Sequence, residues 1–317
     1  MSKILFIGGS LNVTTMMHEI AKHLRAHDCR FSPFYADGPV LAALKRLGLL
    51  EYTILGGAAR ARTLDHFRLH NLTVDDGGRN GGYDLVVMGT DLVVPHNVEG
   101  KPIVLVQEGM VDPENYRYHL VRRFGFPRYL ANTSTTGLSH AYRRFCVASE
   151  GFRNVFIKKG VPAEKIEVTG IPNFDHASSY LDNDFPHRGY VLAATSCLRE
   201  NMKYENRKRF IQKALDVAGP RRLIFKLHPN EDIVRAKREI ARHAPGALVF
   251  AEGNTNHMIA NAEAVVTKYS SVALLAAAMG KEIHSDLDPA WLEQVKPLQT
   301  GGASAARIAS ICEEYLH

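Results

Sequence analysis

The fold is decided by the stretch Arg221-Arg222-Leu223-Ile224-Phe225-Lys226-Leu227-His228-Pro229-Asn230. A similar pattern occurs in Ala264-Val265-Val266-Thr267-Lys268-Tyr269-Ser270-Ser271. In each stretch, an apolar run typical of a buried strand ends abruptly in polar residues. In an open α/β sheet, ligands bind at the carboxyl ends of the strands, where loops meet helix N-termini. The two stretches therefore predict an α/β sheet with a ligand site at its carboxyl edge.

The polar residues at these strand ends suit an anion. Ser270 and Ser271 precede the helix expected over 272–279, and they offer two hydroxyls and free backbone N–H groups. The helix dipole favours negative charge at that position. Lys226 and His228 would add positive charge and N–H donors beside it. We interpret the combination as a phosphate-binding site.

The chain has 317 residues, about twice the usual size of a domain. Hydrophobic residues make up 45% and charged residues 23%, as in ordinary globular proteins. The formal net charge of +6 fits a polyanionic ligand, an anionic membrane surface or nucleic acid equally well. Nucleic acid is not expected as a partner, because no stripe of Lys and Arg interleaved with aromatic residues is present.

Strands and helices are expected to alternate in both halves of the chain. The first unit is a strand over 4–7, a loop containing Gly8 and Gly9, and a helix over 14–26. Its glycines do not form GxGxxG, which argues against an NAD site. A Pro- and Asp-rich stretch up to residue 187 is the best linker. We predict domains over 1–172 and 188–302, and a terminal helix over 303–317 that packs back on the first domain.

The four cysteines are widely spaced and form no CxxC pair. Reduced, buried thiols in a cytoplasmic protein explain them best. The apolar run over 4–7 is too short for a signal peptide or a membrane span, and no other segment is long and apolar enough to cross a bilayer. A cytoplasmic location is therefore expected.

The segment from Val168 to Asp175, which follows Lys-Lys-Gly-Val-Pro-x-x-Lys-Ile, resembles the domain junction of GT-B nucleotide-sugar enzymes. These include glycosyltransferases and the non-hydrolysing UDP-N-acetylglucosamine 2-epimerases. The order of landmarks matches from Ile4 to about Asp286. The resemblance implies an α/β protein of the GT-B class, with two Rossmann-like, doubly wound domains facing across a cleft.

The comparison with the epimerases holds only in part. Residues 105–110 and 112–115 are similar to the family's His-Val-Glu-Ala-Gly-Leu and Pro-Glu-Glu-x-Asn segments. The family's Thr-His-Arg-x-Glu-Asn signature appears as residues 195–201 without the catalytic histidine. Its Asp-Ser-Gly-Gly-x-x-Glu-Glu loop appears as residues 268–275, without the two glycines and the ribose-binding glutamate. Epimerase activity is therefore the alternative.

Bacterial GT-B transferases that use CMP-sugars (sialyl- and Kdo-transferases) and CDP-alditol polymerases share an acidic-Gly, a His-Pro and a Ser-Ser motif. This chain has Gln107-Glu108-Gly109, His228-Pro229 and Ser270-Ser271 in the same order. The resemblance implies that Glu108 is the general base that takes the proton of an acceptor hydroxyl. His228 would stabilise or protonate the leaving phosphate, and the two serines would bind it.

The implied reaction is an inverting, single-displacement transfer of a sugar from a pyrimidine nucleotide (CMP, CDP or UDP type) to a glycan or glycolipid acceptor. It belongs to bacterial surface polysaccharide or glycolipid synthesis. If the acceptor is lipid-linked, a basic flank (Lys45, Arg46, Arg60, Arg62 and Arg68) would touch the inner face of the membrane. No cofactor or metal is expected, because the chain has no Asp-x-Asp signature and no His, Cys and Asp cluster with ligand spacing.

The predicted site residues fall into three groups. Besides the catalytic pair Glu108 and His228, the donor- and phosphate-binding residues are Lys226, Pro229, Asn230, Ser270, Ser271, Ser196 and Gly170, and the acceptor-side residues are Gly9, Ser10, Thr14, Asp91 and Glu114. Donor identity would depend on Ser196, Asn201, Asn230 and residues 254–257.

Structural explanations compete with several of these roles. A Ser-Ser pair at a helix start is a common N-cap, tight packing explains glycines, and Asp91 suits either acceptor binding or a structural role. Other histidines, among them His23, His27, His66 and His70, are interpreted as surface residues on helices. A non-catalytic sugar-nucleotide-binding protein is a second alternative. The sugar, base and acceptor are open, as is the oligomeric state, with a homodimer as one option.

Overall fold

The structure of the chain is a computed structural model, and it describes residues 1–51, 53–200 and 203–316. The chain divides into two compact units. Unit 1 comprises Met1–Asp175 and Gly302–His317, and unit 2 comprises His176–Gly301. The change of unit falls inside the stretch expected to be a linker.

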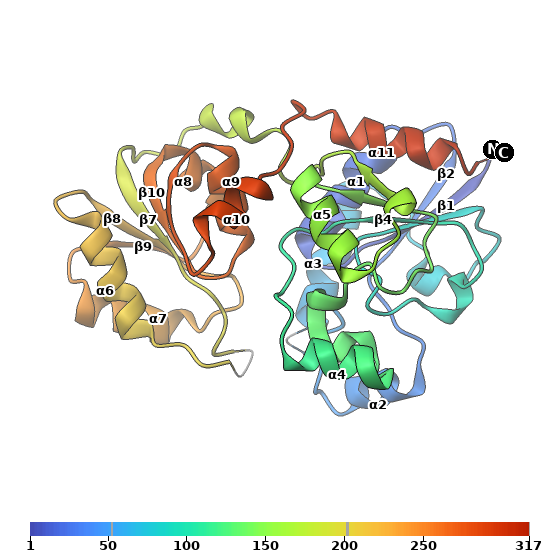
Figure 1. The fold of residues 1–317 in the computed structure, drawn as a ribbon, viewed down its shortest axis with the longest axis horizontal. Coiled ribbons are helices and arrows are strands. Elements are labelled where there is room, and N and C mark those ends of the chain that lie inside the picture. Colours follow the sequence, from blue (N-terminus) through green and yellow to red (C-terminus); the bar gives the residue numbers. More distant parts are fainter. Residues whose placement is uncertain (52, 201–202, 317) are drawn as a thin grey trace. The chain divides into compact units, whose positions relative to one another are not determined.

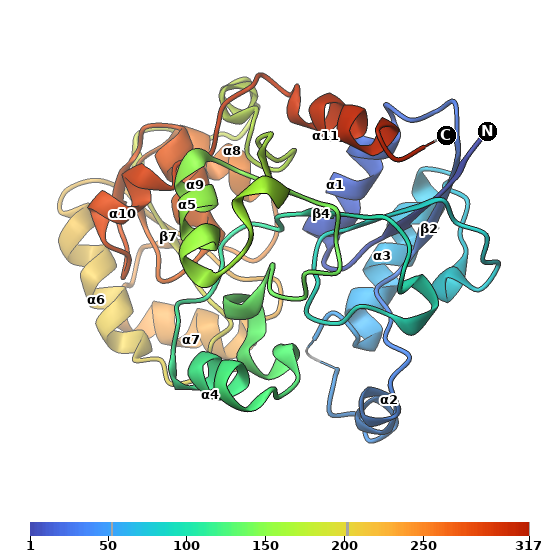
Figure 2. The ribbon, with the colours of Figure 1, turned by 45° about the vertical axis from the view of Figure 1, so that its right-hand side comes forward.

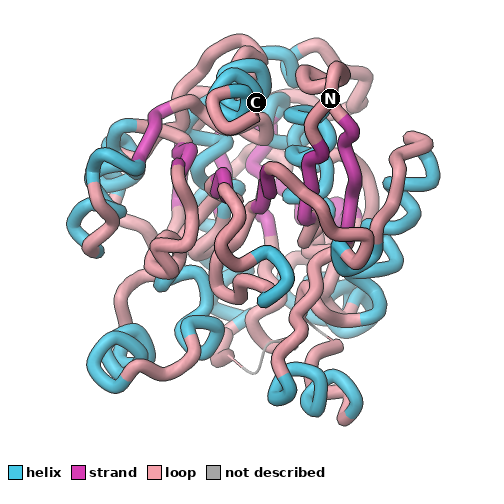
Figure 3. The backbone as a smooth tube through the Cα atoms, turned by 90° about the vertical axis from the view of Figure 1, so that its right-hand side faces the viewer, coloured by secondary structure: helices cyan, strands magenta, loops and turns pink. Residues whose placement is uncertain are grey.

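Unit 1 is built on a parallel sheet with the strand order β2-β1-β3-β4-β5-β6. Its strands are β1 (Lys3–Ile7), β2 (Asp28–Ser32), β3 (Leu85–Met88), β4 (Ile103–Val106), β5 (Arg144–Val147) and β6 (Ile166–Val168). Its α-helices are α1 (Leu11–Ala21), α2 (Pro39–Arg46), α3 (Gly57–Leu69), α4 (Tyr116–Phe124), α5 (Glu150–Lys159) and α11 (Ser304–Glu313). Short 3-10 segments are η1 (Asp76–Gly78), η2 (His96–Val98), η3 (Arg128–Thr135) and η4 (Ala163–Lys165). Figure 3 shows two strands side by side near the N-terminus.

The central strands of unit 1 are hydrophobic on both faces, as expected for a sheet covered by helices on each side. All four residues of β3 and all four of β4 are buried. The first and last helices of the unit, α1 and α11, lie against each other (Figures 1 and 2). The two termini are therefore close together in space (Figure 1).

Unit 2 contains a second parallel sheet, with the strand order β11-β10-β7-β8-β9. Its strands are β7 (Tyr190–Ala194), β8 (Leu223–Lys226), β9 (Leu248–Phe250), β10 (Ala262–Val266) and β11 (Glu282–His284). Its helices are η5 (Ala177–Leu181), α6 (Arg207–Ala218), α7 (Ile233–His243), α8 (Thr255–Asn261), α9 (Ser271–Ala278) and α10 (Pro289–Gln294). Three of these elements, η5, β11 and α10, were not predicted, because short segments carry too little periodicity to be recognised.

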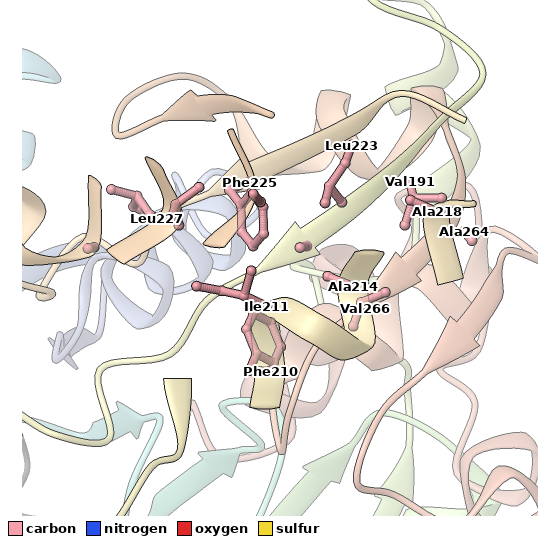
Figure 4. Close-up of a cluster of buried hydrophobic side chains, with 14 residues drawn as sticks. Val191, Phe210, Ile211, Ala214, Ala218, Leu223, Phe225, Leu227, Ala264 and Val266 are labelled. Carbon is pink, nitrogen blue, oxygen red and sulfur yellow. The ribbon is translucent and has the colours of Figure 1, made fainter. Parts of the chain in front are cut away.

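Alternate strand residues of unit 2 form the core under α6 and α7. Val191, Phe225 and Val266 belong to one buried cluster with Phe210 and Ile211, and Phe225 lies near Ile211 in Figure 4. The opposite face of the sheet is covered by α8, where the buried Tyr190 hydroxyl donates a hydrogen bond to the Met258 carbonyl at 2.6 Å. Helices therefore cover both faces of this sheet.

The helix expected over 14–26 begins and ends earlier, at Leu11 and Ala21. Its start is set by Ser10, whose side chain accepts a hydrogen bond from the Val13 N–H and caps the first turn. Within the described residues, no helix combines the length and the apolar character that crossing a membrane would take.

Candidate functional site

In unit 1, the polar strand ends meet at the point where the sheet reverses its direction of winding. The chain runs from β1 to its neighbour β2 and then returns to β3 on the other side of β1. The loops after β1 and β3 therefore lead to opposite faces of the sheet, and the carboxyl edge at such a point is where open α/β sheets bind ligands. The loop after β4, which carries Glu108, lies one strand further along.

Glycines let the first turn of α1 approach these strand ends. A Cβ atom on Gly89, just after β3, would lie 2.6 Å from Cγ1 of Val13. A Cβ atom on Gly8 would lie 2.9 Å from Oγ1 of Thr14. Larger residues at either position would push α1 away from the sheet. The Gly8-Gly9 loop is thus required for packing, and the packing brings the helix N-terminus to the carboxyl edge.

The central contact of this edge joins Ser10 to Glu108. The Ser10 hydroxyl donates a hydrogen bond of 2.9 Å to Oε1 of Glu108. Glu108 is partly buried, and burial raises its pKa, while the bond from Ser10 acts in the opposite direction. A carboxylate whose pKa is raised in this way is a stronger base than an exposed one. Glu108 can therefore accept a proton from a bound hydroxyl.

Two other predicted acceptor-side residues, Gly9 and Thr14, lie in or beside the first turn of α1, and both are buried. Thr14 is fully buried, and its hydroxyl bonds to the Ser10 carbonyl at 3.0 Å and contacts the Thr63 hydroxyl at 3.1 Å. The Gly9 carbonyl accepts a bond from Thr63. The structure therefore gives Thr14 and Gly9 a packing role between α1 and α3, and it leaves Ser10 as the polar group facing Glu108.

Asp91 and Glu114 are not brought to this contact. Asp91 is 1% exposed, and its two carboxylate oxygens accept hydrogen bonds from the backbone N–H groups of Gly137 and Ser139, each at 2.9 Å. This geometry corresponds to the structural explanation for Asp91, since both oxygens hold a loop. Glu114 is exposed in the loop that precedes α4.

In unit 2, the reversal of winding falls between β7 and β10. The chain passes from β7 to β8 and β9 in one direction, and β10 pairs with the other side of β7. The ends of β7 and β10 are tied together, because the Thr267 hydroxyl donates to the Ala194 carbonyl at 3.3 Å. The predicted residues Ser196, Ser270 and Ser271 follow these two strands, at the edge where a ligand is expected.

His228 is held in a defined orientation after β8. Its backbone N–H donates to the Thr195 hydroxyl at 3.0 Å, and its Nδ1 accepts a hydrogen bond of 3.1 Å from the Asn230 backbone N–H. In the neutral ring, the proton is therefore on Nε2, which lies 3.8 Å from Sγ of Cys197. Pro229 and Asn230 are exposed beside it. The arrangement presents an N–H donor at the strand end.

Ser270 is the N-cap of α9, and its side chain accepts a hydrogen bond of 3.2 Å from the Val272 N–H. Ser271 is the first residue of the helix, and both serines are partly buried. The capping explanation thus holds for Ser270. A phosphate role remains compatible, since a hydroxyl that accepts from the backbone still has its proton to donate.

Buried contacts occupy the Lys226 ammonium, whereas the donor-side role of Gly170 stays a prediction. The Lys226 ammonium is buried and donates to the carbonyls of Leu227 and Ala251, each at 2.9 Å, and burial lowers its pKa. It ties the ends of β8 and β9 together and is not a phosphate contact. Gly170 belongs to unit 1, where its positive φ of 73° explains the glycine. Asn201 lies outside the described residues.

The loops after β7 and β8 are joined by a buried ionic cluster that the sequence did not reveal. Arg207 donates to Glu205 at 2.9 Å and also to Glu231, and neither glutamate side chain is exposed. Glu231 also accepts a 2.5 Å hydrogen bond from Thr195, whose hydroxyl in turn accepts from His228. The cluster therefore supports the loop that carries His228. Charged residues in a polar segment are usually interpreted as surface residues. No pattern in the sequence therefore predicted this cluster.

An open pocket of ≈ 560 Å³ lies on the α6 side of unit 2. Its lining includes Asn206, Arg209, Lys213, Thr267 and Lys268. Among the described residues, none of the predicted donor-binding residues lines it. The pocket thus adjoins the end of β10 without containing the predicted site.

The prediction that no cluster of His, Cys and Asp residues has ligand spacing is wrong. Three histidines, His18, His66 and His70, lie with their ring nitrogens within 4.8 Å of one another, so a cluster with ligand spacing does exist. His66 lies in α3 and His70 is the C-cap of that helix, and their spacing of four residues puts them on the same side. That spacing was visible in the sequence, whereas the third member comes from α1 and is joined only by packing.

Neither a scan against models of protein families nor a search of curated proteins found a match. Solved structures, in contrast, are similar over almost the whole chain. The UDP-GlcNAc 2-epimerase from Neisseria meningitidis bound to UDP-GlcNAc is 11% identical with a TM-score of 0.60, covering 99% of this chain and 100% of its own. The S. aureus MnaA–UDP co-structure is 13% identical with a TM-score of 0.62, covering 100% and 97%.

The wall teichoic acid polymerase TagF is also similar, at 11% identity and a TM-score of 0.55, covering 99% of this chain and 88% of that chain. Likeness at such low identity shows the fold alone. The chain has the α/β fold of the GT-B class, with two Rossmann-like units, and this confirms the fold predicted from the sequence.

Proposed function

We propose that the chain is a GT-B glycosyltransferase that moves a sugar from a pyrimidine-nucleotide donor to a glycan or glycolipid acceptor. The observation that carries the proposal is the contact between Ser10 and Glu108 at the carboxyl edge of unit 1. It places a carboxylate with a raised pKa at a strand end where a hydroxyl substrate can bind. A general base of this kind is what glycosyl transfer to an alcohol needs.

In the proposed reaction, the acceptor oxygen attacks the anomeric carbon as the bond from that carbon to the nucleotide phosphate breaks. Glu108 takes the proton of the acceptor hydroxyl. The negative charge that develops on the departing phosphate is met by the Nε2–H of His228 and by the N-terminus of α9, where Ser270 and Ser271 lie. A single displacement of this kind inverts the configuration at the anomeric carbon, and it needs no metal ion.

The alternative is an epimerase acting on UDP-N-acetylglucosamine. One similar structure is a UDP-GlcNAc 2-epimerase bound to UDP-GlcNAc, and another is a co-structure with UDP. The residues favour the transferase. The segment over 195–201 has no histidine, and the segment over 268–275 has neither the paired glycines nor the glutamate of the epimerase motif. Incubating the protein with UDP-N-acetylglucosamine and analysing the sugar for the C2 epimer distinguishes the two activities.

The first experiment is a thermal-shift panel with CMP, CDP, UDP, GDP, ADP and their sugars, with and without Mg²⁺. A ligand that binds the native state raises the apparent Tm by mass action. We expect one pyrimidine nucleotide to raise Tm selectively, and we expect His228→Ala to abolish the shift. If no nucleotide raises Tm, the phosphate-site assignment is wrong and only the fold remains.

The catalytic role is tested with Glu108→Gln on the donor identified by the panel. Loss of a general base is expected to lower kcat by about 10²–10⁴-fold, while nucleotide binding remains. The matched control is Glu164→Gln, because Glu164 is an exposed residue of unit 1, and it should retain full turnover. Full turnover in Glu108→Gln would exclude Glu108 as the base. Nucleotide binding with no transfer by the wild type to any glycan or glycolipid acceptor would favour a non-catalytic binding protein.

A further inference from the structure

Three histidine side chains of unit 1 converge at the contact between α1 and α3. Nδ1 of His18, in α1, lies 3.2 Å from Nε2 of His66, in α3. The ring of His70, at the end of α3, lies 4.8 Å from that of His18 and 4.4 Å from that of His66, measured between centroids. One ring nitrogen from each residue lies within 4.8 Å of the other two.

The convergence follows from how the two helices pack. Thr14 of α1 contacts Thr63 of α3 at 3.1 Å between the hydroxyl oxygens. One turn further along each helix, the residues at the same interface are His18 and His66, and His70 follows after another turn of α3. The helix contact therefore begins with two threonines and continues as a cluster of imidazoles.

The interface is poor in apolar contacts. Thr63 and Phe67 are the buried residues of α3, so Phe67 is the large apolar side chain that anchors this helix. His18 and His66 are partly buried and His70 is exposed, and Phe31 packs edge-on against the His18 ring. The charged neighbours are Glu19 and Lys22, which pair with each other at 2.6 Å. Burial is the largest cause that lowers the pKa of His18, to about 4, followed by Lys22 and the other two histidines.

We propose that His18, His66 and His70 bind one divalent transition-metal ion of the borderline class, Zn²⁺ above all, and that the ion clamps α1 to α3. Imidazole nitrogen is a preferred ligand of Zn²⁺, with Zn–N distances of about 2.0–2.1 Å. In a tetrahedral site, such distances put two ligand nitrogens roughly 3.4 Å apart. The 3.2 Å separation of the His18 and His66 nitrogens is close to that value.

The site would take three protein ligands, and its fourth position would be open to water. His70 is exposed, and one of its ring nitrogens lies within 4.8 Å of those of His18 and His66. The alternative explanation is a hydrogen bond between the His18 and His66 rings with His70 stacked beside them, which binds no metal. The metal site is separate from the Ser10–Glu108 contact. The metal-binding proposal is therefore independent of the proposed transferase activity.

The test is equilibrium dialysis of the full-length, tag-free protein against Zn²⁺ after removal of metals with a chelator. The bound metal is counted by elemental analysis, and Co²⁺ in place of Zn²⁺ reports the coordination by its visible absorption. The variants are His66→Gln and His70→Gln. The matched control is His23→Gln, because His23 is an exposed histidine just after α1 and lies outside the cluster.

We expect the wild type and His23→Gln to bind one equivalent of Zn²⁺ with the same affinity and to gain Tm when it is added. We expect each α3 variant to bind at least about tenfold more weakly, since one of three ligands is missing. His70→Gln should melt like the wild type without metal, because His70 is exposed. The proposal is overturned if the wild type binds no stoichiometric Zn²⁺, or if binding is equally strong in His70→Gln.

Discussion

The Ser10 side chain has two roles at one position. Its oxygen accepts a hydrogen bond from the Val13 N–H and so caps α1, and its hydroxyl donates a hydrogen bond to Glu108. A helix cap is thereby coupled to the group proposed as the base. Because the hydrogen bond stabilises the charged carboxylate, it moderates the rise in the pKa of Glu108 that burial causes.

The coupling predicts a shift of the pH profile in Ser10→Ala. Without the hydroxyl, the pKa of Glu108 rises further, and the acid limb of kcat/KM moves to higher pH because the base must be deprotonated. The measurement is the rate against pH for both proteins. Ser149→Ala is the matched control, because Ser149 caps α5 in the same way and its loss also costs about 1 kcal/mol. An unchanged acid limb in Ser10→Ala would show that the contact does not tune Glu108.

At the scale of elements, the strand ends of unit 2 depend on charged residues that are buried. Arg207 in the first turn of α6 neutralises Glu205 and Glu231 and also bonds to the Ser196 carbonyl at 3.3 Å. Arg199 makes a two-point contact with Glu239 of α7, at 2.7 and 2.8 Å. The loops after β7 and β8 are thus fixed to the two helices that cover one face of the sheet.

Arg207→Met is expected to destabilise unit 2 by about 3–5 kcal/mol, because it removes the cation that bonds directly to two buried carboxylates. Glu205 and Glu231 then keep only their longer contacts to Arg199, at 3.3 and 3.7 Å. The loss should shrink as the pH falls, since burial already raises the pKa of Glu231 and protonation removes its charge. Urea unfolding at several pH values measures it. Lys208→Met, at the exposed neighbouring position, should change the free energy of unfolding little. Equal stability of the two variants would contradict the ionic role.

At the scale of the whole molecule, the end of the chain completes the unit in which it began. The backbone N–H of Ser304 donates to Asp175 at 2.8 Å, and Glu313 contacts His27 at 3.1 Å. Ile308 and Cys312 of α11 are fully buried. The chain thus passes through unit 2 and returns, so residues at its two ends share one core.

Ile308→Ala is expected to cost about 2–5 kcal/mol, and the loss should be confined to unit 1, because the cavity opens between α11 and its neighbours in that unit. Hydrogen exchange measured by mass spectrometry should show faster exchange in α1 and β1 and unchanged exchange in β7 and β8. Arg307→Ala, at an exposed position of the same helix, is the control. Faster exchange in both units would show that they unfold together.

Local patterns were enough to predict two parallel sheets, most of their strands and the cap at Ser270, because apolar runs and caps are encoded over a few residues. The pairing of Ser10 with Glu108, the buried Arg207 cluster and the three histidines depend on contacts between distant segments. Lys226 and Asp91 show the same limit, since burial gave them backbone partners where the sequence suggested ligand contacts. The sequence by itself determined which acidic, basic and hydroxyl side chains follow each strand. Tertiary packing decided which of these side chains bond to the backbone and which can contact a ligand.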